Sequence, residues 1–351
     1  MSTALPTLVA PSLGDPGRTG ARGGFAWWYL DLVDEAGDGV VAIVSLGLPF
    51  LPGYASSARA GRAPEARERP SVCLAVVRGG RPWFWALHET DPEDVRWEPG
   101  LVRLGGSRFE VRIDGDRVSA RGVLQGQLPR CPWRAELEVE GPLRRPSLGE
   151  PRSAAHEWTV LTAVARGSAS VRACDRDLTV TGRAYLDRNT GDRWLGALDC
   201  ADWTWGRLAL PEAERIWYVA TAGDGVAHSR SVTIDARGHT EVVEGRASVV
   251  GWRRTAWGLA VPTAVAVDRD LVVPFGAPLD DSPFYARFLV AGGGGRGVAE
   301  VCRPGAIDAA WFRPLLRMTV CNDRAPAQNS VWLPLFGGTR AGRLARLVGL
   351  A

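Results

Sequence analysis

The chain of 351 residues is 46% hydrophobic and 23% charged, with a formal net charge of +3, which excludes a disordered protein and gives a length sufficient for about two domains. All 42 cationic residues are Arg, which excludes chemistry that depends on a lysine Schiff base or a phosphate-loop lysine. Because the net charge is small and the Arg residues are not gathered in one stripe, we expect no nucleic-acid partner.

The first part of the chain shows neither a targeting signal nor a membrane span. Residues 1–22 lack the basic start and the long apolar core of a signal peptide and are predicted to form a tail. The longest apolar stretch, Gly39–Tyr54, is broken by Gly47 and two prolines and is shorter than the ~20 residues of a spanning helix. It therefore predicts two strands and a turn. We expect a cytoplasmic protein whose six cysteines are free thiols.

Predicted strands follow one another through most of the chain. Between Val102 and Leu124, apolar residues recur at every second position, and Gly105-Gly106 and Asp114-Gly115 stand at the breaks. This spacing predicts consecutive β-hairpins. The same alternation predicts strands at Ser71–Val77, Ala135–Val139, Ser170–Cys174, Leu178–Gly182, Ile216–Thr221, Ser231–Ile234, Leu259–Val267 and Tyr285–Val290.

The spacing of these strands predicts the fold class. Turn signals recur at about 8–12 residues, which is typical of β-sandwiches and β-barrels. The polar, proline-containing segment Gly141–Ala155 separates two strand-rich regions and is predicted to be a linker. We therefore predict an all-β protein with a tail at 1–22, a first β domain at 23–150 and a second at 151–351.

Helical patterns are scarce. Only Ala306–Leu316 and Arg340–Leu350 predict helices, and the Arg-rich segment Ser56–Arg69 predicts an exposed loop. In the last helix, Arg residues alternate with Leu and Val. This pattern suits a short helix that lies on an anionic membrane surface, and the alternative is a frayed, solvated tail.

The aromatic residues are the first indication of function. The chain has 15 Trp, several of them in clusters such as Trp27-Trp28-Tyr29 and Trp203-x-Trp205. Because successive residues of a strand face opposite sides, Trp27 shares a face with Tyr29, and Trp203 shares one with Trp205. These rings either pack in a core or line an apolar pocket for a long, flat ligand or a carbocation.

Few residues are candidates for acid–base chemistry. Glycine-rich nucleotide-binding motifs and the His spacings of metal sites are absent, so we expect no nucleotide cofactor and no metal. Alternation puts Tyr185 and Asp187 on one strand face, where burial would raise the pKa of the carboxyl group and keep it protonated as a general acid. The alternative is that Asp187 begins a turn, since Asn189 follows closely. His156 shares a strand face with Trp158 and has either a structural or a functional role.

Seven stretches then combine into one pattern. They are Trp27-Trp28-Tyr29, Ser71-Val72-Cys73-Leu74, His156-x-Trp158, Gly182-x-x-Tyr185-x-Asp187-x-Asn189-x-Gly191, Asp202-Trp203-x-Trp205-Gly206-Arg207, Leu279-Asp280-x-Ser282-Pro283-Phe284-Tyr285-x-Arg287 and Phe312-Arg313-x-Leu315-Leu316. In this order they resemble the carotenoid 1,2-hydratase family, the hydroxyneurosporene synthases. The resemblance spans about residues 23–322.

The resemblance implies a fold of two lipocalin-like β domains packed together, similar to that of tocopherol cyclase and some fungal pericyclases. It also implies cofactor-independent addition of water to the terminal 1,2 double bond of an acyclic carotenoid of the neurosporene or lycopene type. Asp187 would protonate C2 of this substrate, and the faces of Tyr185 and Trp158 would stabilise the tertiary cation at C1. His156 would position or deprotonate the attacking water. The residues expected to bind substrate are Trp28, Trp203, Trp205 and Tyr285.

A lipophilic polyene substrate implies a second partner, the surface of the inner membrane, with which the protein would associate peripherally. Two alternatives keep the fold but change the function. One is a cyclase or isomerase acting on another polyene or a polyketide, and the other is a non-catalytic carrier of a lipophilic ligand. The presence of Tyr185-x-Asp187 together with His156-x-Trp158 favours an enzyme.

Overall fold

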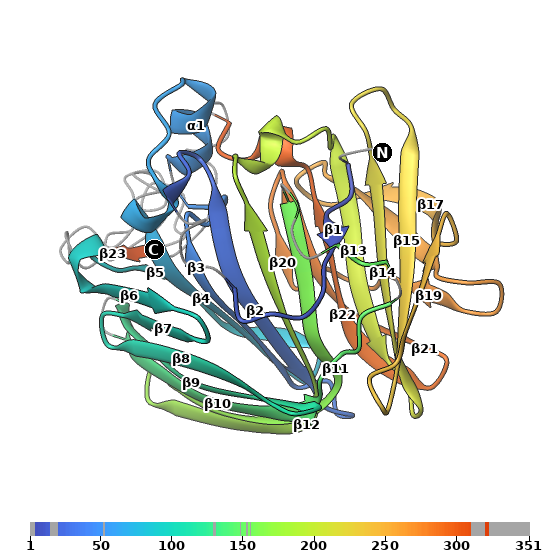
Figure 1. Ribbon diagram of the computed structural model, residues 1–351, viewed down its shortest axis with the longest axis horizontal. Coiled ribbons are helices and arrows are strands. Elements are labelled where there is room, and N and C mark those ends of the chain that lie inside the picture. The colour runs from blue at the N-terminus through green and yellow to red at the C-terminus, as the bar shows by residue number, and fades with distance from the viewer. Residues whose placement is uncertain are drawn as a thin grey trace.

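The computed structural model describes residues 4–14, 20–51, 53–128, 131–147, 149–151, 154, 156–309 and 320–322. These residues form strands almost throughout (Figure 1). Helices in this part of the chain are limited to α1 (Tyr54–Arg59) and single 3-10 turns. The prediction of an all-β protein with few short helices is confirmed.

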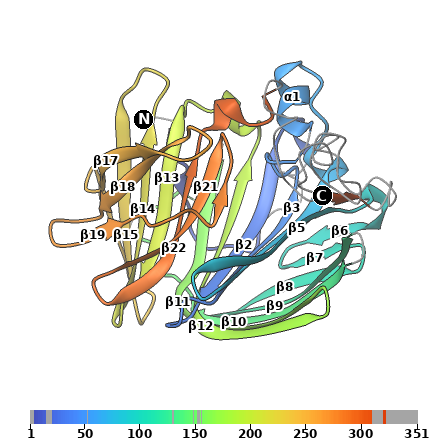
Figure 2. The ribbon, with the colours of Figure 1, turned by 180° about the vertical axis from the view of Figure 1, so that it is seen from behind.

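The first sheet is large and curls on itself. Its order is β23 (Val320–Asn322), β5 (Arg81–Glu89), β4 (Pro70–Arg78), β3 (Gly39–Leu46), β2 (Phe25–Val33), β12 (Arg176–Gly191), β11 (His156–Ala173), β10 (Cys131–Pro142), β9 (Arg117–Leu128), β8 (Ser107–Asp114), β7 (Leu101–Leu104) and β6 (Val95–Glu98), with β1 (Thr7–Leu8) beside β11. Strands β6 to β10 curve beneath β2 to β5, so that β7 and β9 face β4 and β5 (Figures 1 and 2).

A second sheet stands against the first. Its order is β16 (Thr240–Glu244), β15 (Ala227–Asp235), β14 (Ala213–Thr221), β13 (Asp202–Ala209), β22 (Gly295–Cys302), β21 (Tyr285–Gly292) and β20 (Asp280–Asp281). A small sheet of β17 (Ser248–Arg254), β18 (Ala260–Ala266) and β19 (Val272–Pro274) covers its outer side. The two large sheets meet where β2 lies against β22, and β11 against β14 and β15.

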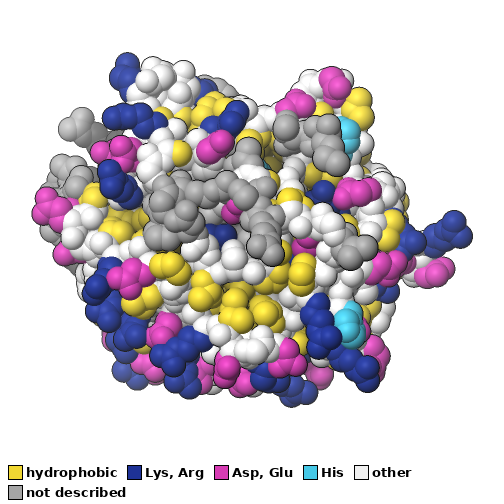
Figure 3. Space-filling model, viewed as in Figure 1, with side chains coloured by type: hydrophobic (Ala, Val, Ile, Leu, Met, Phe, Trp, Pro, Cys, Tyr) yellow, Lys and Arg dark blue, Asp and Glu magenta, His cyan; other side chains and the backbone are white. Residues whose placement is uncertain are grey.

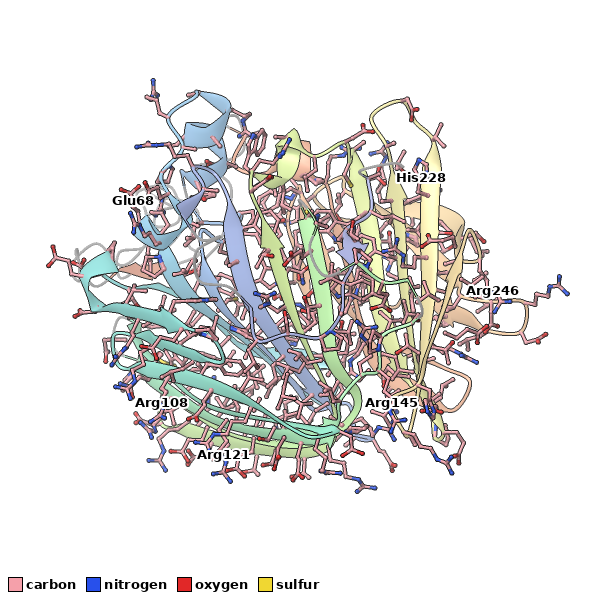
Figure 4. The ribbon with its side chains drawn as sticks, viewed as in Figure 1. Glu68, Arg108, Arg121, Arg145, His228 and Arg246 are labelled. Atoms are coloured by element: carbon pink, nitrogen blue, oxygen red, sulfur yellow. A yellow bond between two sulfur atoms is a disulfide. The ribbon has the colours of Figure 1, made fainter. Side chains whose placement is uncertain are left out.

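Residue patterns explain which strands lie at this junction. Strands β9 and β10 alternate buried and exposed residues, because one face lines the curl and the other meets water. Charged side chains such as Arg108 and Arg121 project from this outer surface along the lower rim (Figures 3 and 4). Strands β2, β3 and β4 are instead buried on both faces. This double burial explains the unbroken apolar run Gly39–Leu46.

Several local predictions need correction. The stretch Gly39–Tyr54 supplies one strand and not two, because the chain turns after Leu46 and enters α1. The predicted loop Ser56–Arg69 contains most of α1, which Arg59 fastens by donating to the carbonyls of Ile307 and Asp308. In the described part of the predicted helix Ala306–Leu316, Ala306 is the last residue of a 3-10 turn, and residues 307–309 are not helical. The rest of that helix, and all of Arg340–Leu350, lie outside the described residues.

The expectation that every cysteine is free is wrong for two of them. Cys131 and Cys174 form a disulfide, because β10 and β11 pair so that both residues fall at the same end of neighbouring strands. Cys73, Cys200 and Cys302 are free and buried.

The predicted linker joins two strands of one sheet. Residues 143–155 run from β10 to β11, which pair directly with each other. Arg144 of this segment is buried, donates to the carbonyls of Val9 and Val160, and pairs with Glu150. The domain boundary at residue 150 stays a prediction. In the described part of the chain, no helix is long and apolar enough to cross a membrane.

Candidate active site

The candidate acid lies on β12, on the face turned toward the second sheet. Strand alternation places Tyr185 and Asp187 on this face, as predicted, and Asn189 lies there with them. Asp187 stands between Val160 of β11 and Tyr29 of β2 in the pairing register. Its exposed fraction is 3%. Asp187 is therefore part of a continuous strand, and the alternative that it begins a turn is excluded.

Three side chains hold the carboxyl group of Asp187. The Tyr185 hydroxyl and Trp158 Nε1 both donate to Oδ2 at 2.8 Å, and Asn189 Nδ2 donates to Oδ1 at 3.1 Å. Trp158 Nε1 also lies 3.2 Å from the Tyr185 oxygen. The carboxyl group is thus fixed in place by neutral donors.

The electrostatic setting keeps Asp187 protonated. Burial raises the pKa of its carboxyl group, and the hydrogen bonds from Tyr185 and Trp158 oppose that rise. The negative charges of Glu300 and Asp31 raise it further, and the resulting pKa is about 7. Because burial outweighs the donors, Asp187 carries a proton at neutral pH over a large fraction of molecules.

Asp187 opens into a small, ring-lined cavity of about 50 Å³ between the two sheets. Its lining combines six aromatic side chains with three polar ones: Trp27, Tyr29, Trp158, Trp203, Trp205 and Tyr218, with Asp187, Asn189 and Glu300. The rings pack on one another, with the Tyr29 and Trp205 centroids 5.3 Å apart and those of Trp158 and Tyr218 6.1 Å apart. Such a site offers aromatic rings to a cation.

A larger cavity of about 380 Å³ adjoins the first and shares Trp27, Tyr29, Trp203 and Glu300 with it. In the first sheet, one register row runs from the acid along the floor of both cavities, and it consists of Asp187, Tyr29, Ile43, Cys73 and Leu87. This row is apolar beyond Tyr29. An apolar chain end that enters the larger cavity is therefore directed toward the acid.

The facing row of the second sheet is charged. Tyr218, Trp205, Glu300, Arg287 and Asp280 are successive register partners across β14, β13, β22, β21 and β20. Arg287 donates to Glu300 at 3.0 Å and to Asp280 at 2.8 Å. One guanidinium is thus paired with two carboxyl groups beside the larger cavity.

A second charged network lies behind Tyr185. Arg207 of β13 is fully buried, donates from Nε to Asp31 of β2 at 2.8 Å, and pairs with Glu214 of β14 at 2.7 Å. Its guanidinium lies 5.8 Å from the Tyr185 ring centroid. Burial raises the pKa of Glu214 to about 7 even beside this guanidinium. The network joins the two large sheets next to the acid.

The structure brings most of the predicted site residues together. Trp158, Asp187, Trp203 and Trp205 line the small cavity, and Tyr285 lines the larger one. Tyr185 contacts Asp187 directly.

Trp28 is a correction. It packs on the opposite face of β2, inside the curl of the first sheet, with Phe109 6.2 Å away between ring centroids. Its neighbours Trp27 and Tyr29 line the cavities instead of Trp28.

His156 lies near the site but is not among the residues that line either cavity. Its ring meets Phe25 edge-on at 5.3 Å, and Phe25 stacks on Trp27 at 4.8 Å. Burial lowers the pKa of His156 to about 4, so the ring is neutral at neutral pH. No hydrogen bond joins this ring to Asp187.

The cavity residue least visible in the sequence is Glu300. It stands alone among apolar neighbours in Val298-Ala299-Glu300-Val301, and a charged residue inside such a strand is the only available signal. Asn189 was visible in the motif around Asp187. Among the described residues, no group of His, Cys, Asp and Glu is arranged to hold a metal ion.

Two curved, mainly antiparallel sheets around a buried carboxyl group of raised pKa define a lipocalin-like β protein with a candidate acid site between its sheets. The chain belongs to the carotenoid hydratase CrtC family, whose family model matches residues 42–331.

Two curated relatives show the same likeness. The acyclic carotenoid 1,2-hydratase of Thiocapsa roseopersicina is 27% identical over 282 residues, which are 76% of this chain and 64% of that protein. The acyclic carotenoid 1,2-hydratase of Rubrivivax gelatinosus is 26% identical over 296 residues, which are 77% of this chain and 66% of that protein. The chain thus spans about two thirds of the length of these relatives.

Solved structures share the fold at low sequence identity. A protein from Nitrosomonas europaea described as an AttH superposes with a TM-score of 0.57 at 18% identity, covering 87% of this chain and all of that one. CghA in complex with Sch210972 gives a TM-score of 0.50 at 10% identity, covering 86% and 95%. These likenesses concern the fold alone.

Proposed function

We propose that the protein adds water across the terminal 1,2 double bond of an acyclic carotenoid of the neurosporene or lycopene type. The observation that carries the proposal is the buried carboxyl group of Asp187, held by Tyr185 and Trp158 in a cavity lined by aromatic rings. Family membership and the names of the two curated relatives support the substrate class.

The first step is proton transfer from Asp187 to C2. The π electrons of the double bond form the new C2–H bond, Asp187 becomes a carboxylate, and C1 becomes a tertiary cation. Alkenes are weak bases, so the acid must hold its proton in a dry site at neutral pH. The raised pKa of about 7 meets that need.

The cation is stabilised by its surroundings. The rings of Trp158, Tyr185 and Trp205 lie near the acid, and a ring whose face meets the cation contributes about 0.5–2 kcal/mol. The new carboxylate of Asp187 adds Coulombic attraction. A closed, ring-lined cavity also limits competing losses such as cyclisation.

The second step is addition of water to C1, with loss of a proton from that water. The product is a tertiary alcohol, and the atoms balance without any electron transfer, so we propose a cofactor-independent reaction. Burial lowers the pKa of His156 to about 4, which makes it a weak proton acceptor, and it lines neither cavity. We therefore propose that His156 positions the cavity residue Trp27 through Phe25 and does not handle the water directly.

Such a substrate dissolves in lipid, so we propose peripheral contact with an anionic membrane from the cytoplasmic side. The supporting surface is the outer face of the small sheet, where Val250, Trp252 and Val272 are 45%, 54% and 51% exposed. Exposed Arg254 belongs to the same face, and Arg246 extends from the preceding turn (Figure 4). Apolar side chains beside arginines suit the interface of an anionic bilayer.

A short segment of the chain connects this small sheet to the lining of the larger cavity. After β19 the chain reaches Leu279 within five residues, and Leu279 lines that cavity. Arg253 of β17 donates to the carbonyl of Phe275 in this connection. A bilayer in contact with the small sheet would therefore lie beside the segment that borders the cavity.

The proposal is tested by expression in a lycopene-accumulating bacterial host, with the wild type, Asp187→Asn and the control Glu157→Gln in parallel. Glu157 is a buried, Arg-paired carboxylate outside both cavities. We expect a product heavier than lycopene by one water from the wild type and the control, and none from Asp187→Asn. A product of unchanged mass would indicate a cyclase or isomerase. Bound pigment without turnover, unaffected by Asp187→Asn, would indicate a carrier.

A further inference from the structure

Glu300 occupies the junction of the two cavities. It lines both of them, and its side chain is 14% exposed. It belongs to β22 of the second sheet, whereas Asp187 belongs to β12 of the first. The two acidic groups therefore enter the small cavity from opposite sheets.

The surroundings of the two carboxyl groups differ. Asp187 is held by neutral donors, whereas Glu300 forms an ion pair with Arg287, which also pairs with Asp280. Arg287 Nε donates a charge-assisted hydrogen bond to Glu300 Oε1 at 3.0 Å. The site thus presents a proton donor on one sheet and an anionic acceptor on the other.

The small cavity has the size and polarity of a water site. Its volume of about 50 Å³ compares with about 30 Å³ for one water molecule in the liquid. Asp187, Asn189 and Glu300 supply polar partners there. The two cavities meet at Trp27, Tyr29, Trp203 and Glu300, so a water in the small cavity would stand beside an isoprenoid end that enters this junction from the larger one.

We propose that Glu300 is the general base of the hydration, an inference that rests on the proposed function. As the water oxygen forms its bond to C1, one O–H bond breaks and the proton passes to the Glu300 carboxylate. A second water that fills the emptied cavity then carries a proton from Glu300 to the Asp187 carboxylate. This relay restores both groups without any other reactant.

The test separates protonation from hydration by using D₂O. An acyclic carotenoid in detergent micelles is incubated with the wild type, Glu300→Gln, Asp187→Asn, His156→Gln and the control Glu157→Gln. The product alcohol and the recovered alkene are analysed by mass spectrometry. We expect Glu300→Gln to lower alcohol formation about 100-fold or more. It should still incorporate deuterium at C2 of the alkene, because Asp187 continues to protonate C2 and to recover a proton from it.

The other variants have distinct expected results. Asp187→Asn should lose both deuterium exchange and hydration, and Glu157→Gln should keep both. Glu300→Asp, which keeps the charge on a shorter side chain, should recover more hydration than Glu300→Gln. Glu300→Asp also tests the role of Glu300 if Glu300→Gln does not fold.

Two results would overturn the inference. One is hydration by Glu300→Gln within a few-fold of the wild type. The other is a pair of results: His156→Gln exchanges deuterium without hydrating the alkene, and Glu300→Gln does not show this behaviour. That pair would assign the base to His156. A wild type that neither exchanges nor hydrates the substrate would instead refute the proposed function.

Discussion

The surroundings of Asp187 lower the stability of the fold at high pH and provide an acid for the reaction. Its neutral donors would suit a carboxylate, but burial and the nearby negative charges outweigh them and raise its pKa to about 7. Because the pKa is raised in the folded state, the free energy of unfolding depends on pH. A carboxyl group with a folded-state pKa above its unfolded value stabilises the fold at low pH, and this contribution is lost as the pH rises from about 4 to about 7.

We therefore predict that Asp187→Asn stabilises the protein above neutral pH while it abolishes hydration. The neutral amide removes the cost of a buried charge, which linkage puts at up to about 4 kcal/mol for a rise of this size. The free energies of unfolding of both proteins, measured in urea at pH 5 and pH 8, check this. The variant should gain on the wild type between the two pH values. If the difference in the free energy of unfolding between variant and wild type were equal at the two pH values, or favoured the variant more at pH 5, this would contradict a raised pKa.

At the scale of elements, the site depends on how two sheets are joined. Arg207 of β13 binds Asp31 of β2 and Glu214 of β14, and all three side chains are buried. The pairing fixes the second sheet against the strands that carry Tyr29 and Asp187. Breaking one member of such a network leaves unpaired charge in the interior, which is far more costly than losing a surface pair.

We predict that Arg207→Met lowers the free energy of unfolding by about 3–5 kcal/mol, because two buried carboxylates lose their cation. The matched control is Arg121→Met, whose pair with Glu138 is 80% and 65% exposed and is worth about 1 kcal/mol or less. Urea unfolding at several pH values measures both. The loss in Arg207→Met should shrink as the pH falls below about 7, since Glu214, whose pKa is raised by burial, then becomes protonated. Equal losses in the two variants would show that the network does not hold the sheets together.

Strand periodicity explains why much of the site was predictable. The two-residue repeat places Tyr185 with Asp187 and Trp203 with Trp205, and both pairs share faces in the structure. The same rule separates Trp28 from its neighbours without telling which face meets the cavity. Because β2 is buried on both sides, its sequence is apolar on both faces. Only its register with β12 and its contact with the second sheet decide which face meets the cavity.

At the scale of the whole molecule, the cavities exist only where the sheets meet. Glu300 is far from Asp187 in sequence, and the register of β22 against β13 that brings it opposite Trp205 leaves no local trace. The disulfide Cys131–Cys174 likewise depends on a register. The all-β class follows from alternation, whereas the curl of the first sheet depends on long-range pairing.

The whole molecule must also reach its substrate in lipid. We predict that Trp252→Ser lowers co-sedimentation with vesicles of anionic lipid several-fold, because one large exposed side chain of the small sheet is removed from the interface. The control is Val226→Ser, another exposed apolar residue, in the turn before β15. Vesicles of neutral lipid should bind more weakly, owing to the arginines. Equal binding of the wild type and Trp252→Ser would remove this face from the docking surface.

The central claim, that a protonated Asp187 performs the hydration, is tested most directly by the rate of alcohol formation as a function of pH in the wild type and in Tyr185→Phe. The account predicts a wild-type rate that falls about tenfold per pH unit above a pH of about 7, as the acid loses its proton. Tyr185 donates to Asp187 and lowers its pKa, so the Phe variant should move this limb upward by about one pH unit. A rate that rises or stays constant from pH 6 to about 9 in the wild type would contradict the claim, because an ionised Asp187 has no proton to give.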